Sequence, residues 1–449
     1  IMMSYYSELY TFGELKKTVP EIRYTSQKKN RYGENRLRAD GLLEYPCRTL
    51  ASLFSPAIFY GEKLSSIRKI IKQKIQEEFA RNSLIRTIPQ QGRNNARLVL
   101  TLMKILDGKL VENLTGLYVP SNALDVMTDI AIASPAVCAY RQSGNEEDAQ
   151  MVAKAVVSVF NKPESAAVID LMYNKKNDDD YYESVLDYCA IGNLQAVLDE
   201  YLYMAPEDKK LGQVVTDAII GTSNLSIDTT DSLGKEEKKQ LMRCHFAIPF
   251  IDKTVTDKSV TRTTNIRKAF NSPFRPFLLS TTSIGQEGLD FHWYARKIVH
   301  WNLPSNPVDL EQREGRINRF KCLAIRRNVV KLYASETYHT WDELFSMAYS
   351  NLKGMHSDIV PYWCLPVAEL TEEQRAKLEY IERIVPLYPL SRDRYKYERL
   401  IKVLALYRMT LGQPRQEELL SLLRNMHLSD EQLKELTIDL CPYNKIESL

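Results

Sequence analysis

The spacing of apolar residues over the first 160 or so positions is typical of amphipathic helices. In EKLSSIRKIIKQKIQEEF, residues 62–79, apolar residues recur every three or four positions, which predicts a helix with one buried stripe. The stripe consists of Leu64, Ile67, Ile71, Ile75 and Phe79. Further helices are predicted over 95–110, 122–141 and 146–163, the first closed by Gly108 and the last stopped by Pro163. We therefore expect a mainly helical region over residues 1–163 and a helical linker or insertion over 164–210.

The pattern changes near residue 211. Short runs rich in β-branched and aromatic residues alternate with helix-length segments, which predicts a parallel sheet flanked by helices. These runs are SNLSIDT (223–229), CHFAIPFI (244–251), PFLLST (276–281), KIVHW (297–301) and NVVKLY (328–333). The fold class is therefore α/β, with one sheet domain over residues 211–345.

The last hundred residues return to helical spacing. Helices are predicted for WDELFSMAYSNL (341–352), for TEEQRAKLEYIERI (371–384) and for 394–426, the last divided at Gly412-Gln413-Pro414. We expect residues 346–449 to form a helical C-terminal extension.

Composition adds a local charge imbalance. The 449 residues carry a formal net charge of +3, but residues 261–333 contain 13 Lys or Arg against 5 Asp or Glu. The basic character is thus concentrated in the α/β region. The seven cysteines are scattered without a C-x-x-C pair, so neither a zinc site nor a disulfide framework is indicated. No apolar run approaches 18 residues, which favours a cytoplasmic chain that makes no membrane contact, and the start at Ile1 favours a fragment of a longer protein.

Three successive carboxylates stand at Asp178, Asp179 and Asp180. They could hold a divalent cation through their oxygens. A solvated helix start is the preferred interpretation, because three consecutive side chains point in different directions and acidic residues suit a helix N-terminus. We predict no metal site in the chain.

Two motifs in the α/β region carry the candidate chemistry. TSIGQEGLD (282–290) directly follows an expected strand, so its glycines would lie at the carboxyl edge of the sheet, where main-chain N–H groups can approach a phosphate. QREGRINR (312–319) supplies Gln312, Arg316 and Arg319, which would share one face of a helix, with Gly315 allowing close backbone approach. The alternative is a solvated, salt-bridged helix face, since Glu311 and Glu314 stand beside these arginines.

The two motifs together resemble motifs V and VI of superfamily 2 helicases and translocases. The resemblance is strongest over residues 267–327, is closest to bacterial helicases related to the Swi/Snf translocases, and covers the second of the family's two RecA-like domains. It implies that Thr282 contacts a nucleic-acid phosphate and that Asp290 helps to position the ATP ribose and the arginines. It also implies that Gln312 faces the nucleotide and that Arg316 and Arg319 reach the γ-phosphate of ATP. Stabilisation of charge on a transferring phosphoryl group by such an arginine is worth about 10³–10⁵ in rate.

Neighbouring residues complete the predicted site. We assign Gly288 and Gly315 to the ATP contact with Asp290 and Gln312. The predicted nucleic-acid contacts are Thr281, Thr282, Ser283, Arg296, Lys321, Arg326 and Arg327. A solvated turn is the competing interpretation of the last three. His292 and His300 are interpreted as packed histidines, and Trp293, Tyr294 and Trp301 as core residues, with base stacking as the alternative for the aromatic side chains.

The sequence lacks a phosphate-binding loop of the type G-x-x-x-x-G-K-[ST], since Gly108-Lys109 and Gly234-Lys235 have neither the earlier glycine nor the hydroxyl residue. ATP and Mg²⁺ are therefore expected mainly on a first RecA-like domain, either in cis or on a partner chain. The expected function is that of the C-terminal half of an ATP-dependent helicase or translocase acting on DNA, most simply duplex DNA, or on RNA. Related bacterial proteins occur in phage-defence islands, which implies defence-system subunits as partners. The alternative is a non-catalytic nucleic-acid-binding or scaffold module that retains the fold.

Overall fold

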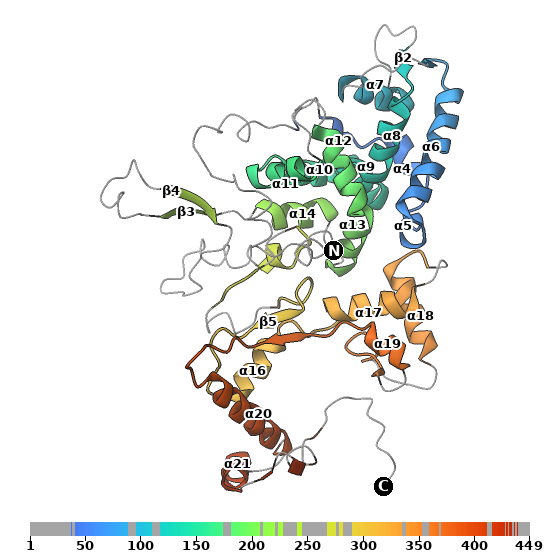
Figure 1. Ribbon diagram of the computed structural model, residues 1–449. Helices are drawn as coiled ribbons and strands as arrows, with labels where there is room; N and C mark the ends of the chain where they lie inside the picture. The colour runs from blue at the N-terminus through green and yellow to red at the C-terminus, as the bar shows by residue number, and fades with distance from the viewer. Residues whose placement is uncertain are drawn as a thin grey trace. The chain divides into compact units, whose positions relative to one another are not determined.

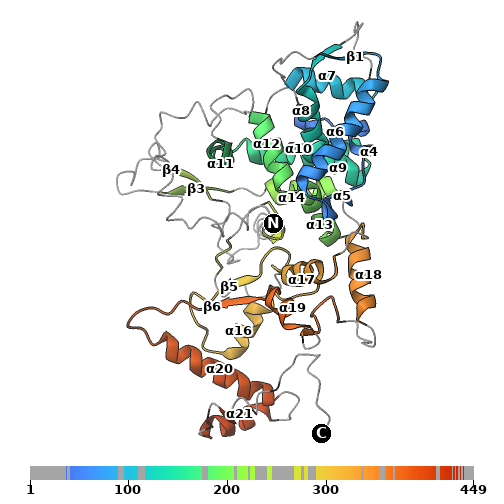
Figure 2. The ribbon, with the colours of Figure 1, turned by 45° about the vertical axis from the view of Figure 1, so that its right-hand side comes forward.

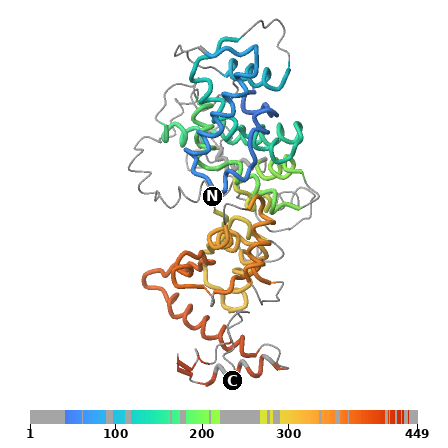
Figure 3. The backbone as a smooth tube through the Cα atoms, turned by 90° about the vertical axis from the view of Figure 1, so that its right-hand side faces the viewer, coloured from blue at the N-terminus to red at the C-terminus, as the bar shows by residue number. Residues whose placement is uncertain are grey.

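The computed structural model describes 41–88, 96–109, 117–173, 181–206, 210–220, 223–227, 240–244, 267–274, 278–281, 290–334, 338–352, 359–367, 370–410, 415–426 and a few single positions. The chain divides into two compact units, coloured mainly blue through green and mainly yellow through red in Figure 3. Unit 1 comprises 1–248, 256–278 and 335–341, and unit 2 comprises 249–255, 279–334 and 342–449. The segment 211–345, grouped as one domain from the sequence, contributes residues to both.

Unit 1 is a helical body (Figure 1). Its helices are α4 (Arg48–Ser52), α5 (Ile58–Gly61), α6 (Leu64–Arg81), α7 (Ala96–Leu106), α8 (Ala123–Ala133), α9 (Pro135–Ser143), α10 (Glu146–Phe160), α11 (Pro163–Tyr173), α12 (Tyr181–Ile191), α13 (Leu194–Met204) and α14 (Leu211–Ile220), after the 3₁₀ turn η2 (Leu42–Glu44). Helix α8 contacts α6, α9 and α12, and α10 contacts α9 and α14. The apolar stripe predicted on α6 is confirmed, since Ile67, Ile71, Ile75 and Phe79 are buried.

Two helix predictions in unit 1 need correction. The helix expected over 122–141 is two helices, because Pro135 disfavours the helical conformation at Ser134, whose ψ is 127°. Pro163 does not simply stop a helix: α10 ends at Phe160, and Pro163 begins α11, since a proline is well tolerated in the first helical turn. The Asp178–Asp180 run lies outside the described residues, immediately before α12.

A buried polar network joins the helices of unit 1. The Arg141 guanidinium donates to the carbonyls of Ala51 (3.0 Å) and Ala131 (2.6 Å) and lies 4.2 Å from the Phe54 ring. Gln195 and Tyr60 both donate to the Asp199 carboxylate, at 2.8 and 2.7 Å. Every polar group named here has a partner, so we interpret the network as structural.

Four described strands lie in two small sheets in the first 250 residues. β1 (Ile85–Ile88) pairs in parallel with β2 (Leu117–Pro120), and β3 (Ser223–Ile227) pairs antiparallel with β4 (Gln240–Cys244). β3 confirms the strand expected at 223–229, but its antiparallel pairing differs from the parallel sheet expected there. The strand expected at 244–251 overlaps β4 only at Cys244, and residues 245–251 lie outside the described part.

Unit 2 contains the third sheet and a second set of helices (Figure 2). β5 (Lys297–Val299) pairs in parallel with β6 (Glu382–Ile384). The helices are α16 (Pro307–Glu314), α17 (Leu323–Tyr333), α18 (Trp341–Asn351), α19 (Glu372–Ala376), α20 (Asp393–Met409) and α21 (Gln416–Asn425). The strand predicted at 297–301 and the division of the last helical stretch are confirmed. Mixed α/β structure is therefore present, while the described residues show only two-stranded sheets.

Three strand or helix predictions in unit 2 are wrong. NVVKLY lies in α17, where Cys322, Ile325, Arg326 and Val329 are buried at helical spacing despite the β-branched pair. Residues 278–281, expected to end a strand, have no strand assignment. The helix expected over 371–384 is only the five-residue α19, and its second half becomes β6, because pairing with β5 outweighs local helix propensity.

Among the described residues, no single helix is long and apolar enough to cross a membrane; the bent pair α8–α9 passes that test by length and composition only.

Candidate nucleotide and nucleic-acid site

The Gln-Gly-Arg-Arg motif spans the end of α16 and the turn that follows it. Asn306 caps the helix by accepting from the Val308 amide (3.1 Å), and Pro307 occupies its first turn. The helix ends at Glu314, where Gly315 N donates to Glu311 O at 2.7 Å and Asn318 N donates to Glu314 O at 3.1 Å. The prediction of one helical face carrying Gln312, Arg316 and Arg319 is therefore wrong, because both arginines follow the helix.

Gly315 has an ordinary φ of −59°, so it is not required for a left-handed turn. A Cβ at this position would lie 3.3 Å from the Glu311 carbonyl oxygen, which is tighter than most such contacts. This contact is with the last turn of α16 itself, so the expected approach of Gly315 to a nucleotide stays a prediction.

The end of the first motif lies beside the turn that carries the arginines of the second motif. Phe291 N donates to the carbonyl of Arg316 at 3.0 Å, and Leu323 N donates to the carbonyl of His292 at 3.1 Å. The Nε atom of Arg319 lies 3.2 Å from Oδ1 of Asp290, and both side chains are about half exposed. One ion pair and two main-chain hydrogen bonds thus join residues 290–292 to 316–323.

The structure tests the other residues predicted in and beside the two motifs less directly. Gln312 is exposed on the last turn of α16, and Thr281 is exposed before the first motif. Thr282, Ser283 and Gly288 lie outside the described residues. The contacts expected of these three positions with a phosphate and with ATP therefore stay predictions.

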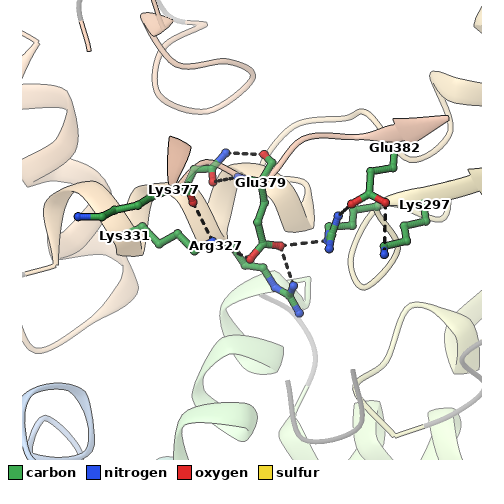
Figure 4. A network of polar contacts seen from close by, with 8 residues as sticks. Lys297, Arg327, Lys331, Lys377, Glu379 and Glu382 are labelled. Carbon is green, nitrogen blue, oxygen red and sulfur yellow. Dashed lines mark hydrogen bonds and ion pairs between the residues drawn. The ribbon is translucent and has the colours of Figure 1, made fainter. Parts of the chain in front are cut away.

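Most of the basic residues around the site are paired within unit 2. Glu379 receives Arg327 Nη1 at 2.7 Å, Lys331 Nζ at 2.8 Å and Arg296 Nε at 3.0 Å (Figure 4). Glu382 also pairs with Arg296 and, at 3.2 Å, with Lys297. Burial would raise the pKa of Glu379, but the hydrogen bonds from Lys331 and Arg327 lower it below its ordinary value. Arg296 and Arg327 therefore stabilise the fold, and their expected availability for nucleic-acid contact is not supported.

Arg326 is fully buried, with 0% of its surface exposed. Its guanidinium donates to the carbonyls of Lys321 (2.7 Å) and Trp293 (2.5 Å) and lies 5.4 Å from the Tyr294 ring centroid. The prediction that Arg326 contacts a phosphate is wrong in this structure. Its side chain instead ties α17 to the two segments that precede it.

Lys321 has a positive φ of 52° and is half-buried, with its ammonium near three aromatic rings. Its Nζ lies 5.3–5.7 Å from the ring centroids of Phe320, Phe345 and Tyr362. Burial lowers the pKa of Lys321 from its ordinary value. The backbone is held as well, since Lys321 N donates to the carbonyl of Tyr362 at 2.8 Å.

Glu311 and Glu314, the carboxylates beside the arginine motif, bind other elements. Arg408 of α20 donates to Glu311 (Nε to Oε1, 3.1 Å), and Arg383 of β6 donates to both oxygens of Glu314 at 2.5 and 2.7 Å. His300 Nε2 also lies 3.2 Å from Glu314 Oε1. Burial would raise the Glu314 pKa, but hydrogen bonds from His300 and Arg383 lower it to about 2. These contacts anchor α16 and fix the start of the arginine turn.

The histidine and aromatic predictions are partly confirmed. His300 is packed, with 2% of its surface exposed, and burial lowers the pKa of His292 to about 4. Trp301 was expected in the core but is 69% exposed. No group of three or more metal-ligating side chains occurs among the residues that the structure describes. Cys47, Cys138, Cys189, Cys322 and Cys364 are free thiols.

Sequence reasoning missed Glu379 and Glu382. They lie more than forty residues beyond the basic segment that they neutralise, in a stretch predicted as helix. Residues 371–384 contain four Glu against three Lys or Arg, so their composition gave little signal.

Comparison with known families defines the class of this region. Residues 222–321 match the family model described as the helicase conserved C-terminal domain, a RecA-like α/β domain. The matched segment contains both motifs and ends at Lys321, just after the arginine turn. The chain thus carries a helicase-type C-terminal domain. Searches of curated proteins and of solved structures found no match.

Proposed function

We propose that this chain is the C-terminal half of an ATP-dependent nucleic-acid translocase or helicase of superfamily 2, related to the Swi/Snf translocases. ATP is the substrate, and its phosphates are held, with Mg²⁺, by a first RecA-like domain in cis or on a partner chain. Arg316 and Arg319 stabilise the charge that develops on the γ-phosphoryl group. Duplex DNA is the proposed track.

The observation that carries the proposal is the contact between the two motifs. The ion pair of Arg319 with Asp290 and the Phe291–Arg316 hydrogen bond couple the end of the first motif to the arginine turn. Movement of residues 282–290 on nucleic-acid binding would therefore shift the arginines, which is the coupling that a motor needs.

The anchoring of α16 supports the same roles. Arg383, His300 and Arg408 occupy the carboxylates of Glu314 and Glu311. Those carboxylates hold the helix, while Arg319 stays 47% exposed, which leaves it open to a nucleotide held by another domain. The turn is thus fixed in position and its terminal arginine is accessible, as preorganised electrostatic stabilisation requires.

The test is nucleic-acid-stimulated ATP hydrolysis by this chain together with the domain, in cis or on a partner chain, that holds ATP. Arg316→Gln and Arg319→Gln should each reduce the rate at saturating ATP by about 10³-fold or more. Arg394→Gln is the control, since Arg394 is 82% exposed and pairs with Glu398 on α20. Unchanged hydrolysis in both variants would contradict the proposal and favour the non-catalytic scaffold.

A further inference from the structure

The first three turns of α20 present a cationic face. Residues 383–402 contain six Lys or Arg against two Asp or Glu. Arg392, at the N-cap of α20, is exposed, as are Lys396 and Arg399, which lie on one side of the helix, and the four-residue step from Arg392 to Lys396 continues the same side. Tyr395 lies on the same side and is 65% exposed.

The opposite side of α20 is occupied by its own unit. Helix α20 contacts α16, beside the β5–β6 pair (Figure 2). Arg408 pairs with Glu311, Tyr397 accepts from Arg383 at 3.3 Å, and Leu400 and Leu404 are buried. Within the described residues, no carboxylate forms an ion pair with Arg392, Lys396 or Arg399. Packing and internal pairing therefore do not account for these three charges.

Two exposed aromatic rings lie next to this face. Trp301, which follows β5, is 69% exposed, and its ring meets that of Tyr388 at a centroid distance of 5.8 Å. Tyr388 is held close to the start of α20, because Ser391 donates to its carbonyl through N (3.2 Å) and Oγ (2.7 Å). Asp393 N in turn donates to Ser391 Oγ at 3.3 Å. The ring pair is thus tied by a short turn to the first turn of the cationic helix.

Together these residues form what we call the α20 surface: Trp301, Tyr388, Arg392, Tyr395, Lys396 and Arg399. From Arg392 to Arg399 the three cations span about 10 Å at the helical rise, so they can face consecutive phosphates of one strand. Exposed rings beside cations suit a polyanion that also offers flat apolar faces, and bases offer such faces when they are unpaired. An acidic protein would account for the cations but gives the exposed rings no partner of matching shape.

We propose that the α20 surface binds an unpaired nucleic-acid strand, with phosphates on Arg392, Lys396 and Arg399 and a base stacked on Trp301. The inference rests on the proposed function, which supplies the nucleic acid, and it adds a contact surface outside the two motifs.

The experiment measures binding of a fluorescent single-stranded oligonucleotide to the full chain without nucleotide. R392Q/K396Q/R399Q should weaken binding about tenfold or more and make the slope of log affinity against log salt shallower by about 2, the value for three lost phosphate contacts. The matched control is K377Q/R394Q/R415Q. It removes the same charge from exposed positions that pair with Glu373, Glu398 and Glu418, and should leave affinity and slope close to those of the unsubstituted chain.

The aromatic contribution is tested separately. W301A should weaken single-strand binding about five- to a hundredfold, the loss expected for one stacked base, and leave duplex binding unchanged. W301F keeps a ring against Tyr388, so it should retain binding but lose the part of the tryptophan quenching that the oligonucleotide causes at this position. Equal weakening by the two triple variants, or no effect of W301A on single strands, would overturn the proposal.

Different measurements contradict the two proposals. If both are correct, R316Q/R319Q abolishes ATP hydrolysis but leaves strand affinity, measured without nucleotide, intact. If only the α20 surface is wrong, its triple variant binds strands normally while the arginine variants still lose hydrolysis.

Discussion

Arg319 and Asp290 form an ion pair, with Nε and Oδ1 3.2 Å apart, between the end of the first motif and the turn that carries the arginines. Because both side chains are about half exposed, the pair should contribute less than about 1 kcal/mol to the free energy of unfolding. Its importance is then positional, since Asp290 limits the directions that the Arg319 side chain can take.

Asp290→Asn should lower nucleic-acid-stimulated ATP hydrolysis about tenfold or more, because an amide holds the guanidinium less firmly, while the urea midpoint changes little. A double-mutant cycle with Arg319→Lys gives the check. If the two substitutions lose activity independently, the pair does not position Arg319.

Glu379 should be a strong determinant of stability. Glu379→Gln leaves Arg296, Arg327 and Lys331 without their shared carboxylate in a site where Glu379 is only 19% exposed. We expect a loss of about 2 kcal/mol in the free energy of unfolding, between the values for exposed and for buried pairs. Urea denaturation measures it. Glu373→Gln is the matched control, because Glu373 pairs with Lys377 at 81% exposure, and this substitution should leave the free energy of unfolding nearly unchanged.

Arg326 should matter for folding and not for nucleic-acid affinity. Arg326→Met removes a buried donor and leaves the carbonyls of Lys321 and Trp293 without it, so a loss of about 3 kcal/mol in the free energy of unfolding is expected. The salt dependence of oligonucleotide binding, measured under conditions where the variant is folded, should be unchanged. A shallower salt slope would indicate that this guanidinium reaches a phosphate after all.

His292 should make unit 2 less stable in mild acid. Burial lowers its pKa to about 4 from an ordinary value of 6.5, so between these values the unfolded chain takes up a proton that the folded chain does not. The free energy of unfolding should therefore fall as the pH drops from about 6.5 towards 4. Thermal melts over this range should show a flatter pH dependence for His292→Asn.

The sequence predicts local features well where one residue pattern decides the outcome. The stripe on α6 and the division of the C-terminal helices follow from helical spacing and from punctuation by glycine and proline. The coupling of Asp290 with the arginines was likewise expected, although from family resemblance and not from spacing.

The features that the sequence does not reveal depend on contacts between residues that are distant in the chain. Arg296, Arg326 and Arg327 have the same local signature as phosphate-binding residues, and only the position of Glu379 and of two carbonyls distinguishes them. In the same way, residues 382–384 form a strand because β5 offers an unpaired edge, not because their sequence demands it. The end of α16 at Glu314 is a third case, since nothing between Glu311 and Arg319 other than Gly315 signals a helix stop.

The parallel pairing of β5 with β6 constrains how the chain can be shortened. A polypeptide that ends at the boundary suggested by family matching, near residue 321, would lack the neighbouring strand of β5, the two carboxylates that pair with Arg296 and the guanidinium that holds Glu314. Such a fragment would expose an open sheet edge and bare positive charge, so it should aggregate or associate with any polyanion in the preparation. Apparent nucleic-acid binding by that fragment would then be caused by the truncation and would not be a property of the longer chain.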